Sequence, residues 1–167
     1  SKSVAILRSA NMSLGINTLF KLLQDAAKVF ASAGFDIEIV EKHHNQKIDA
    51  PSGTALMLAD ALASVRDGET QYMYDRHAQR KKREKSEIGI HSVRGGTIVG
   101  EHEVIFAGNN EVITLSHSAQ SKELFAVGAV NAAVFMSGKG PGLSGGGRPH
   151  SCLFFWPFRA GREGECT

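Results

Sequence analysis

The sequence predicts an α+β fold in which helices cover one mixed β-sheet. Two segments in the first 65 residues have apolar side chains at helical spacing, and each follows a strand-like run. Further strand-like runs and a last helical segment come later, which is the order expected of one sheet with helices packed on it. A length of 167 residues, with 42% hydrophobic and 22% charged residues, is typical of one folded domain.

The first half of the chain is expected to alternate strands and helices. Its first apolar run is followed by Ser9, Asn11 and Ser13, which are residue types that often begin helices. The stretch FDIEIV alternates apolar and acidic residues, as a half-buried strand does. The expected ranges are 4–7 for a buried strand, 14–30 for a helix, 35–40 for the half-buried strand and 52–65 for a second helix.

The second half is expected to contain a meander of strands and a final helix. Residues 88–119 hold three strand-like runs, which are separated by Gly95-Gly96 and by the hairpin signal GNNE. Residues 121–136 return to helical spacing. After Gly138 the chain becomes rich in glycine without periodicity, so residues 144–167 are expected to form an irregular tail.

Composition limits the cellular compartment and the classes of binding partner that are expected for this protein. Cys152 and Cys166 both lie near the end of the chain, so the rest has no disulfide framework and a cytoplasmic location is expected. No apolar run approaches the roughly 20 residues that cross a bilayer, and no membrane partner is expected. The formal charge of +2 does not indicate nucleic acid, and the basic cluster in residues 76–85 is interpreted as a solvated loop instead of an RNA-binding surface.

No metal site is expected. The candidate ligands lie at spacings that match no compact zinc pattern, and the run HEV lacks the helical H-E-x-x-H arrangement. These candidates are His77, His91, Glu101, His102, Glu103 and His117. The run GPGLSG has the spacing of a dinucleotide-binding turn, but it follows a helix instead of a strand and is interpreted as chance.

The segment EKHHNQKIDAPSGTA, residues 41–55, carries the candidate chemistry. A helix that begins near Ser52 leaves free backbone N–H groups at Ser52, Gly53 and Thr54, and its positive dipole end favours a carboxylate or phosphate. Gly53 lets a ligand approach the backbone, and two hydroxyl groups add donors. Lys47 and the two histidines before it add positive charge and protons. We therefore expect an anion site with acids beside it.

These residues also have a structural interpretation. Asp49 could cap the helix, and Pro51 and Ser52 could be ordinary first-turn residues, so capping and anion binding remain equally supported for DAPSGT alone. His43 and His44 could be exposed residues at a strand end, because neighbours in an extended strand point to opposite faces. Both histidines reach one site only if the chain turns there.

The same segment closely resembles the signature E-x-H-H-x-x-K-x-D-A-P-S-G-T-A of the 4-hydroxy-tetrahydrodipicolinate reductase (dihydrodipicolinate reductase) family, with every fixed position present. The segments SANMSLGIN, EIGIHSVRGGTIVGEHEVIFAG and LSHSAQSKELFAVGAV resemble other parts of this family in the same order. The resemblance implies that residues 1–143 form the substrate-binding and oligomerisation domain. Family members also carry an N-terminal Rossmann domain for the dinucleotide, which this chain is expected to lack.

The resemblance further implies that hydride from NADPH or NADH reduces a cyclic dicarboxylate, 4-hydroxy-tetrahydrodipicolinate, to tetrahydrodipicolinate in diaminopimelate and lysine biosynthesis. It assigns the catalytic acids to His43 and Lys47 and implies a homotetramer. The implied substrate contacts are His44, Gly53 and Thr54, to which the helix-end argument adds Ser52, and the implied contacts to the nicotinamide end of the cofactor are Ser9, Ala10, Asn11 and Met12. The alternative is a catalytically silent fragment or oligomerisation module without the nucleotide-binding domain.

Overall fold

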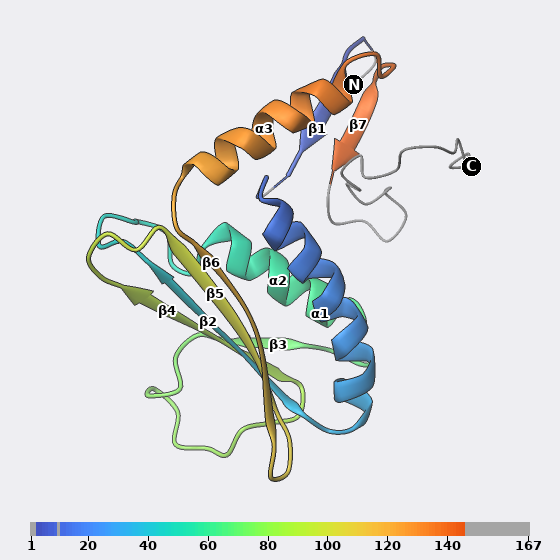
Figure 1. The fold of residues 1–167 in the computed structure, drawn as a ribbon. Helices are drawn as coiled ribbons and strands as arrows, with labels where there is room; N and C mark the ends of the chain where they lie inside the picture. The colour runs from blue at the N-terminus through green and yellow to red at the C-terminus, as the bar shows by residue number, and fades with distance from the viewer. Residues whose placement is uncertain (1–2, 10, 146–167) are drawn as a thin grey trace.

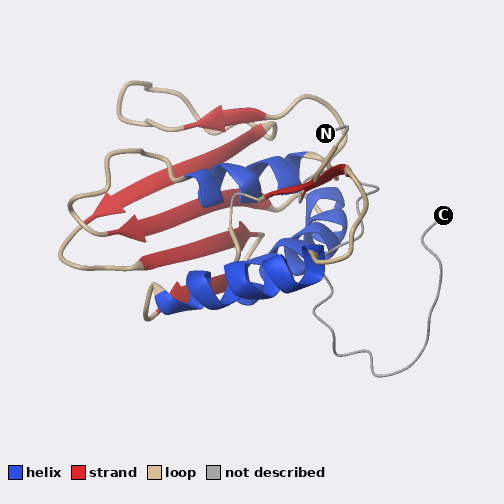
Figure 2. Cartoon of the chain, turned by 90° about the horizontal axis from the view of Figure 1, so that it is seen from above, coloured by secondary structure: helices blue, strands red, loops and turns tan. Residues whose placement is uncertain are grey.

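The structure is a computed structural model in which residues 3–9 and 11–145 are described. Its main feature is a five-stranded mixed sheet with the spatial order β3-β4-β2-β5-β6. The strands are β2 (Asp36–His43), β3 (Gln71–Met73), β4 (Glu87–Arg94), β5 (Gly100–Ala107) and β6 (Val112–Ala119). The central strand β2 pairs in parallel with β4 and antiparallel with β5, and Figure 2 shows the strands side by side. The predicted α+β class with a mixed sheet is confirmed.

Two helices, α1 (Leu14–Ser32) and α2 (Gly53–Ala63), cover one face of this sheet (Figure 1). Helix α1 buries Ile16, Leu19, Leu23 and Ala27, whose spacing of three or four residues places them on one side of the helix. Helix α2 adds Leu62, which is fully buried against them. Burial of such a side chain contributes roughly 1.5–3 kcal/mol. No helix in the described part of the chain is long and apolar enough to cross a membrane.

The predicted meander of β4, β5 and β6 is wrong at its first connection. Strands β4 and β5 are not neighbours, because β2 lies between them and pairs with both. The segment from Gly95 to Val99 therefore crosses the end of β2, over two strand spacings or about 10 Å, which a two-residue hairpin turn does not span. The second connection is the predicted hairpin, since β5 pairs antiparallel with β6 and Asn110 has a φ of 66° in the turn.

The face of the sheet that the helices cover, called the inner face here, changes from apolar to polar along the strands. Its first row is Ile88, Ile37, Phe106 and Ile113, and its second row is Ile90, Ile39, Val104 and Leu115. Its third row is Ser92, Glu41, His102 and His117. Beyond it lie the pair Arg94 and His43 and the pair Gly100 and Ala119. The hydrophobic core and a polar end thus belong to one continuous face.

A second, two-stranded sheet lies apart from the first, beside α3 (Glu123–Met136) (Figure 1). It is formed by the parallel pairing of β1 (Ala5–Arg8) with β7 (Gly142–Gly145). The sequence did not predict β7, because GLSG has no β-branched residue and no apolar alternation. Strand β1 was expected to be buried, yet Ile6 is exposed. The predicted tail lies outside the described residues except for Ser144 and Gly145, which belong to β7.

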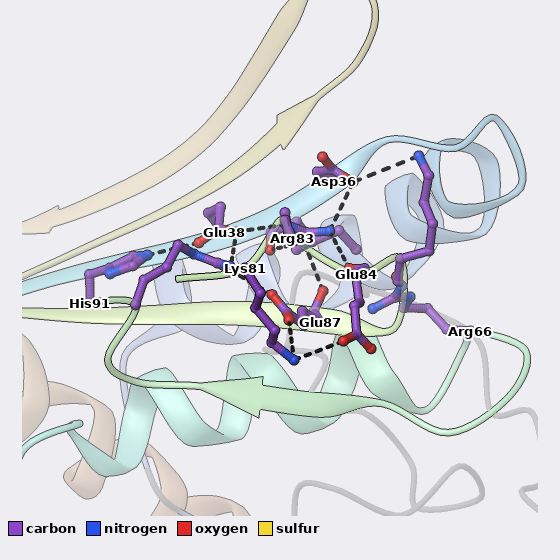
Figure 3. A network of polar contacts seen from close by, with 11 residues as sticks. Asp36, Glu38, Arg66, Lys81, Arg83, Glu84, Glu87 and His91 are labelled. Atoms are coloured by element: carbon purple, nitrogen blue, oxygen red, sulfur yellow. Dashed lines mark hydrogen bonds and ion pairs between the residues drawn. The ribbon is translucent and has the colours of Figure 1, made fainter. Parts of the chain in front are cut away.

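The basic cluster in residues 76–85 is held by ion pairs at the far end of the sheet (Figure 3). Arg83 donates from Nε to Glu38 at 2.9 Å and from a terminal nitrogen to Asp36 at 2.8 Å. Its remaining donors bind the backbone carbonyl oxygens of Ile37, Glu84 and Glu87. Other pairs are Arg76 with Glu87 at 2.7 Å and Lys81 with Glu84 at 2.7 Å. The connection between β3 and β4 is therefore fastened to β2.

Replacement of Arg83 by methionine is expected to lower the free energy of unfolding by about 1.5–3 kcal/mol, the usual contribution of hydrogen bonds to charged groups. Arg80→Met, at an exposed position of the same connection, should change it by less than about 0.5 kcal/mol. Urea unfolding at neutral pH measures both variants. Equal effects at the two positions would show that Arg83 does not fasten the connection.

Candidate active site

A pocket of about 500 Å³ opens where the polar end of the inner face meets the start of α2. Nine of the ten residues that the sequence predicted for the site line it: Ser9, Asn11, Met12, His43, His44, Lys47, Ser52, Gly53 and Thr54. The tenth, Ala10, lies outside the described residues. The pocket thus brings together one short segment before α1, the loop after β2 and the first turn of α2.

The start of α2 presents open backbone to the pocket. Ser52 is the N-cap, and its Oγ accepts a hydrogen bond from the backbone N–H of Ala55 at 3.2 Å. The sequence predicted a free N–H at Ser52, but this N–H donates to the carboxylate of Glu41 at 3.1 Å. The available donors are therefore those of Gly53 and Thr54. No atom lies within 4 Å of the place where a Cβ of Gly53 would stand, so a ligand can approach the backbone there.

The loop after β2 brings both histidines to the pocket. Strand β2 ends at His43, and the chain then turns, with the N–H of Lys47 donating to the carbonyl oxygen of His44 at 3.1 Å. This turn removes the constraint that neighbours in a strand face opposite sides. The ammonium of Lys47 lies 2.7 Å from the carboxylate of Asp49 and lowers the pKa of that carboxyl group. Ser52 caps the helix, whereas Asp49 pairs with Lys47.

Glu41 and Arg94 support the pocket from behind His43, although the sequence did not assign either residue to the site. Glu41 is fully buried on the inner face, and both terminal nitrogens of Arg94 donate to its carboxylate, at 2.8 and 2.7 Å. Nδ1 of His43 lies 2.5 Å from the same carboxylate. Burial by itself raises the pKa of Glu41, but hydrogen bonds from Arg94, Ser92 and His43 outweigh it and lower the pKa to about 2.

His102 and His117 form a second pair of pocket residues that the sequence did not assign. Nε2 of His102 lies 3.2 Å from Oγ of Ser52, and burial lowers the pKa of His102 to about 4. Burial also lowers the pKa of His117, whose Nε2 lies 3.4 Å from Oγ of Ser13. Both rings are therefore neutral hydrogen-bonding groups at pH 7. The sequence feature that could have identified His102 is the alternation along β5, in which every second residue is buried.

The short segment before α1 lines the pocket with Ser9, Asn11 and Met12 and is held from two sides. Nδ2 of Asn11 donates to Oγ1 of Thr54 at 3.0 Å, which joins the segment to the first turn of α2. On the other side, a Cβ at Gly128 would overlap the carbonyl oxygen of Met12, so α3 comes this close only because residue 128 is glycine. These two contacts place Asn11 and Met12 in the pocket lining beside the first turn of α2.

The arrangement suits an anionic small molecule that is to be protonated. The N–H groups at the start of α2 and the ammonium of Lys47 attract a carboxylate. His43 and Lys47, two side chains of types that can donate a proton, line the same pocket. Within residues 3–9 and 11–145, no group of three or more His, Cys, Asp or Glu side chains could hold a metal ion.

His102 is expected to make the protein less stable in weak acid. Its pKa is about 4 in the folded chain, against 6.5 ordinarily, so the unfolded chain binds more protons between these values. The free energy of unfolding therefore falls as the pH decreases from about 6.5 to about 4. In His102→Gln this fall should be smaller, by on the order of 2–3 kcal/mol. Urea unfolding across this pH range measures it, with the exposed His77→Gln as control, and a curve parallel to wild type would contradict the assignment.

The chain is similar to a family of known proteins along most of its length. The family model described as "Dihydrodipicolinate reductase, C-terminus" matches residues 15–145. The 4-hydroxy-tetrahydrodipicolinate reductase of Caldanaerobacter subterraneus subsp. tengcongensis is 64% identical over 143 residues, which are 86% of this chain and 56% of that protein. The corresponding protein of Staphylococcus epidermidis is 51% identical over 143 residues, 86% of this chain and 58% of that protein. The chain thus spans little more than half the length of these relatives.

A solved structure shares the fold. Dihydrodipicolinate reductase from Paenisporosarcina sp. TG-14, with dipicolinate bound, has a TM-score of 0.63 and 29% sequence identity, covering 86% of this chain and 53% of that chain. The family match includes the whole five-stranded sheet and the loop that carries His43, His44 and Lys47. The chain therefore belongs to the dihydrodipicolinate reductase C-terminal family, whose curated relatives are 4-hydroxy-tetrahydrodipicolinate reductases.

Proposed function

We propose that this chain provides the catalytic and substrate-binding part of a reductase that converts 4-hydroxy-tetrahydrodipicolinate to tetrahydrodipicolinate in diaminopimelate and lysine biosynthesis. The observation that carries the proposal is the pocket in which the open start of α2 lies beside His43, His44 and Lys47. Membership in a family of reductases supports the reaction class. The proposed substrate-binding and oligomerisation domain is residues 1–143.

The start of α2 is proposed to hold a carboxylate of the substrate. The N–H groups of Gly53 and Thr54 and the hydroxyl of Thr54 are the donors, and the helix dipole favours the negative charge. His44 completes this subsite from the preceding loop. Ser52 lines the pocket, but its N–H and hydroxyl are already bound within the fold, so we propose that it orients the helix start. Dipicolinate in the similar solved structure supports a dicarboxylate as the ligand class.

His43 and Lys47 are proposed to supply the proton. Tetrahydrodipicolinate lacks the 4-hydroxyl group of the substrate, so this group must leave as water. When hydride then adds to one atom of the resulting double bond, the electron pair left on the other atom must take a proton. Both side chains line the pocket next to the proposed carboxylate subsite. Lys47 is now paired with Asp49, and a bound carboxylate would compete with Asp49 for its ammonium. Substrate binding and the supply of the proton are thereby linked through Lys47.

Residues 9–12 are proposed to contact the nicotinamide end of NADPH or NADH. Ser9, Asn11 and Met12 fit this role because they line the pocket beside the start of α2, where Asn11 bonds to Thr54 and Met12 lies close to Gly128. Ser9, Asn11 and Met12 would hold the ring, together with Ala10, and the cofactor supplies the hydride when it is bound. The proposed cofactor contacts and the proposed proton donors thus line one pocket.

Pyridine-2,6-dicarboxylate is expected to bind this chain, and isothermal titration measures its Kd. Thr54→Ala and Lys47→Ala should each weaken binding about tenfold or more, because each removes a hydrogen-bond donor to a charged group. The matched controls are Thr18→Ala and Lys28→Ala on the exposed side of α1, which should leave Kd unchanged.

No binding by the wild-type chain, or equal binding by Thr54→Ala, Lys47→Ala and their controls, would rule out the proposed substrate site. Oxidation of NADPH or NADH with freshly generated substrate tests the reaction itself. Turnover by this chain would rule out the catalytically silent alternative. Dipicolinate binding without turnover would support a chain that binds the substrate without reducing it.

We also propose that the chain forms a homotetramer through the outer face of the five-stranded sheet, which no helix covers (Figure 1). That face carries Val93 beside Lys42 in the cross-strand register, and Val93 is exposed. Light scattering should give the mass of four chains, and Val93→Glu should lower it by burying a charge in the contact. Val29→Glu, at an exposed position on α1, is the control. A monomeric wild-type chain would contradict this assembly.

A further inference from the structure

We propose that Glu41 is the positioning residue for His43: paired with Arg94, it holds the proton of the neutral imidazole on Nδ1 and leaves Nε2 for the pocket. The inference deepens the proposed function, since it rests on His43 as the group that gives the proton. It concerns a residue that does not line the pocket, because Glu41 is fully buried and contacts Nδ1 of His43 from behind. Its geometry can be tested without measuring turnover.

The carboxylate of Glu41 has a complete set of donors. One oxygen, Oε1, accepts from Arg94 at 2.7 Å and from the N–H of Ser52 at 3.1 Å. The other, Oε2, accepts from Arg94 at 2.8 Å and lies 2.5 Å from Nδ1 of His43. A carboxylate has roughly four acceptor positions, and these four contacts, together with the hydrogen bond from Ser92, use all of them. A carboxylate held in this way cannot rotate without losing several of these bonds at once.

This arrangement determines the tautomer of His43. An ionised carboxylate only accepts hydrogen bonds, so the nitrogen that faces Glu41 must carry hydrogen. That nitrogen is Nδ1, and the neutral ring therefore has its free electron pair on Nε2. The proton that the ring takes up and gives away is then the one on Nε2. With the opposite tautomer, the lone pair on Nδ1 would face a carboxylate, which is repulsive.

Nε2 of His43 points toward Gly100, a residue without a side chain. A Cβ at Gly100 would stand 3.1 Å from Nε2, so the imidazole fits here because residue 100 is glycine. Both residues line the pocket. The nearest neighbouring ring is that of His102, edge-on with centroids 5.2 Å apart, and it is neutral at pH 7. Nε2 is therefore available to a ligand instead of being bound within the protein.

Arg94 extends the same contact to the loop that carries Lys47. Besides Glu41, its guanidinium donates to the carbonyl oxygen of Asp49 at 2.7 Å. The next residue, Gly95, donates its N–H to the carbonyl oxygen of His43 at 2.9 Å. Since Glu41 also binds the N–H of Ser52, one ion pair orients His43, the Lys47 loop and the start of α2. The positioning of the acid and of the anion subsite thus has a common origin.

The test is the ¹⁵N NMR spectrum of the histidine rings in the whole chain, recorded near pH 8.5, above the ordinary range of histidine. In the wild type, His43 should show a protonated Nδ1 and an unprotonated Nε2, with this tautomer favoured about tenfold or more. A wild-type ring that carries its hydrogen on Nε2 would overturn the proposal directly. This measurement needs no variant to fold.

A charge-balanced variant then tests the cause. In Glu41→Gln with Arg94→Met, the amide oxygen can accept from Ser52 while the amide NH₂ faces Nδ1 of His43, so the hydrogen should move to Nε2. Removal of both charges avoids an unpaired buried ion. Glu38→Gln is the matched control, because Glu38 lies on the outer face of the same strand, 2.8 Å from Nε2 of His91. An unchanged His43 tautomer in the charge-balanced variant would overturn the proposal.

Titration of the same samples with pyridine-2,6-dicarboxylate separates this proposal from the proposed function. Because the same ion pair holds the Lys47 loop and the start of α2, the charge-balanced variant should bind more weakly as its tautomer switches, whereas Glu38→Gln should keep the wild-type Kd. A wild-type chain with the expected tautomer but no dicarboxylate binding would reject the proposed function and keep the positioning role. An unchanged Kd in the charge-balanced variant would show that the ion pair does not position the anion subsite and would overturn that part of the proposal.

Discussion

The register of β2 against β4 and β5 is the constraint on which both the core and the pocket depend. It aligns Ile39 with Ile90 and Val104, and two residues further along β2 it aligns Glu41 with His102. A slip by one residue would turn every side chain of β2 to the other face. The apolar rows would then face the outside, and Glu41 and His43 would leave the pocket together. The burial of isoleucine and valine therefore stabilises the one register in which the polar groups meet.

Burial of this polar row is costly unless every group finds a partner, and the structure supplies the partners from several elements. An unpaired carboxylate at the position of Glu41 would be protonated or would destabilise the fold. Arg94 at the end of β4 prevents this with two hydrogen bonds, and Ser52 at the start of α2 adds a third. The polar contacts add little net stability, but they require that β2, β4 and α2 meet in one arrangement. Specific geometry at the site thus comes from groups that the core forces together.

How much the sequence predicts depends on the distance along the chain over which each feature is formed. His43, His44, Lys47 and Thr54 lie within one short segment, so a helix start and its neighbouring acids could be interpreted together, and all line one pocket. The bond from Arg94 to Glu41 joins residues 53 apart, and hydropathy alone carries no signal for such a pair. The central position of β2 was missed for the same reason, because neighbours in sequence are the default guess for neighbours in a sheet.

The two walls of the pocket are supported differently. The wall that carries His43 stands on the inner face of the sheet, beyond the fully buried Ile39 and Glu41. The segment that carries Asn11 and Met12 instead approaches α3, where Gly128 leaves room for the carbonyl oxygen of Met12. It is joined to the first wall by the bond from Asn11 to Thr54 at 3.0 Å, made from the first turn of α2. The spacing between a ligand on α2 and one against residues 9–12 is therefore governed by polar contacts, which hydration and binding change more readily than a close-packed core.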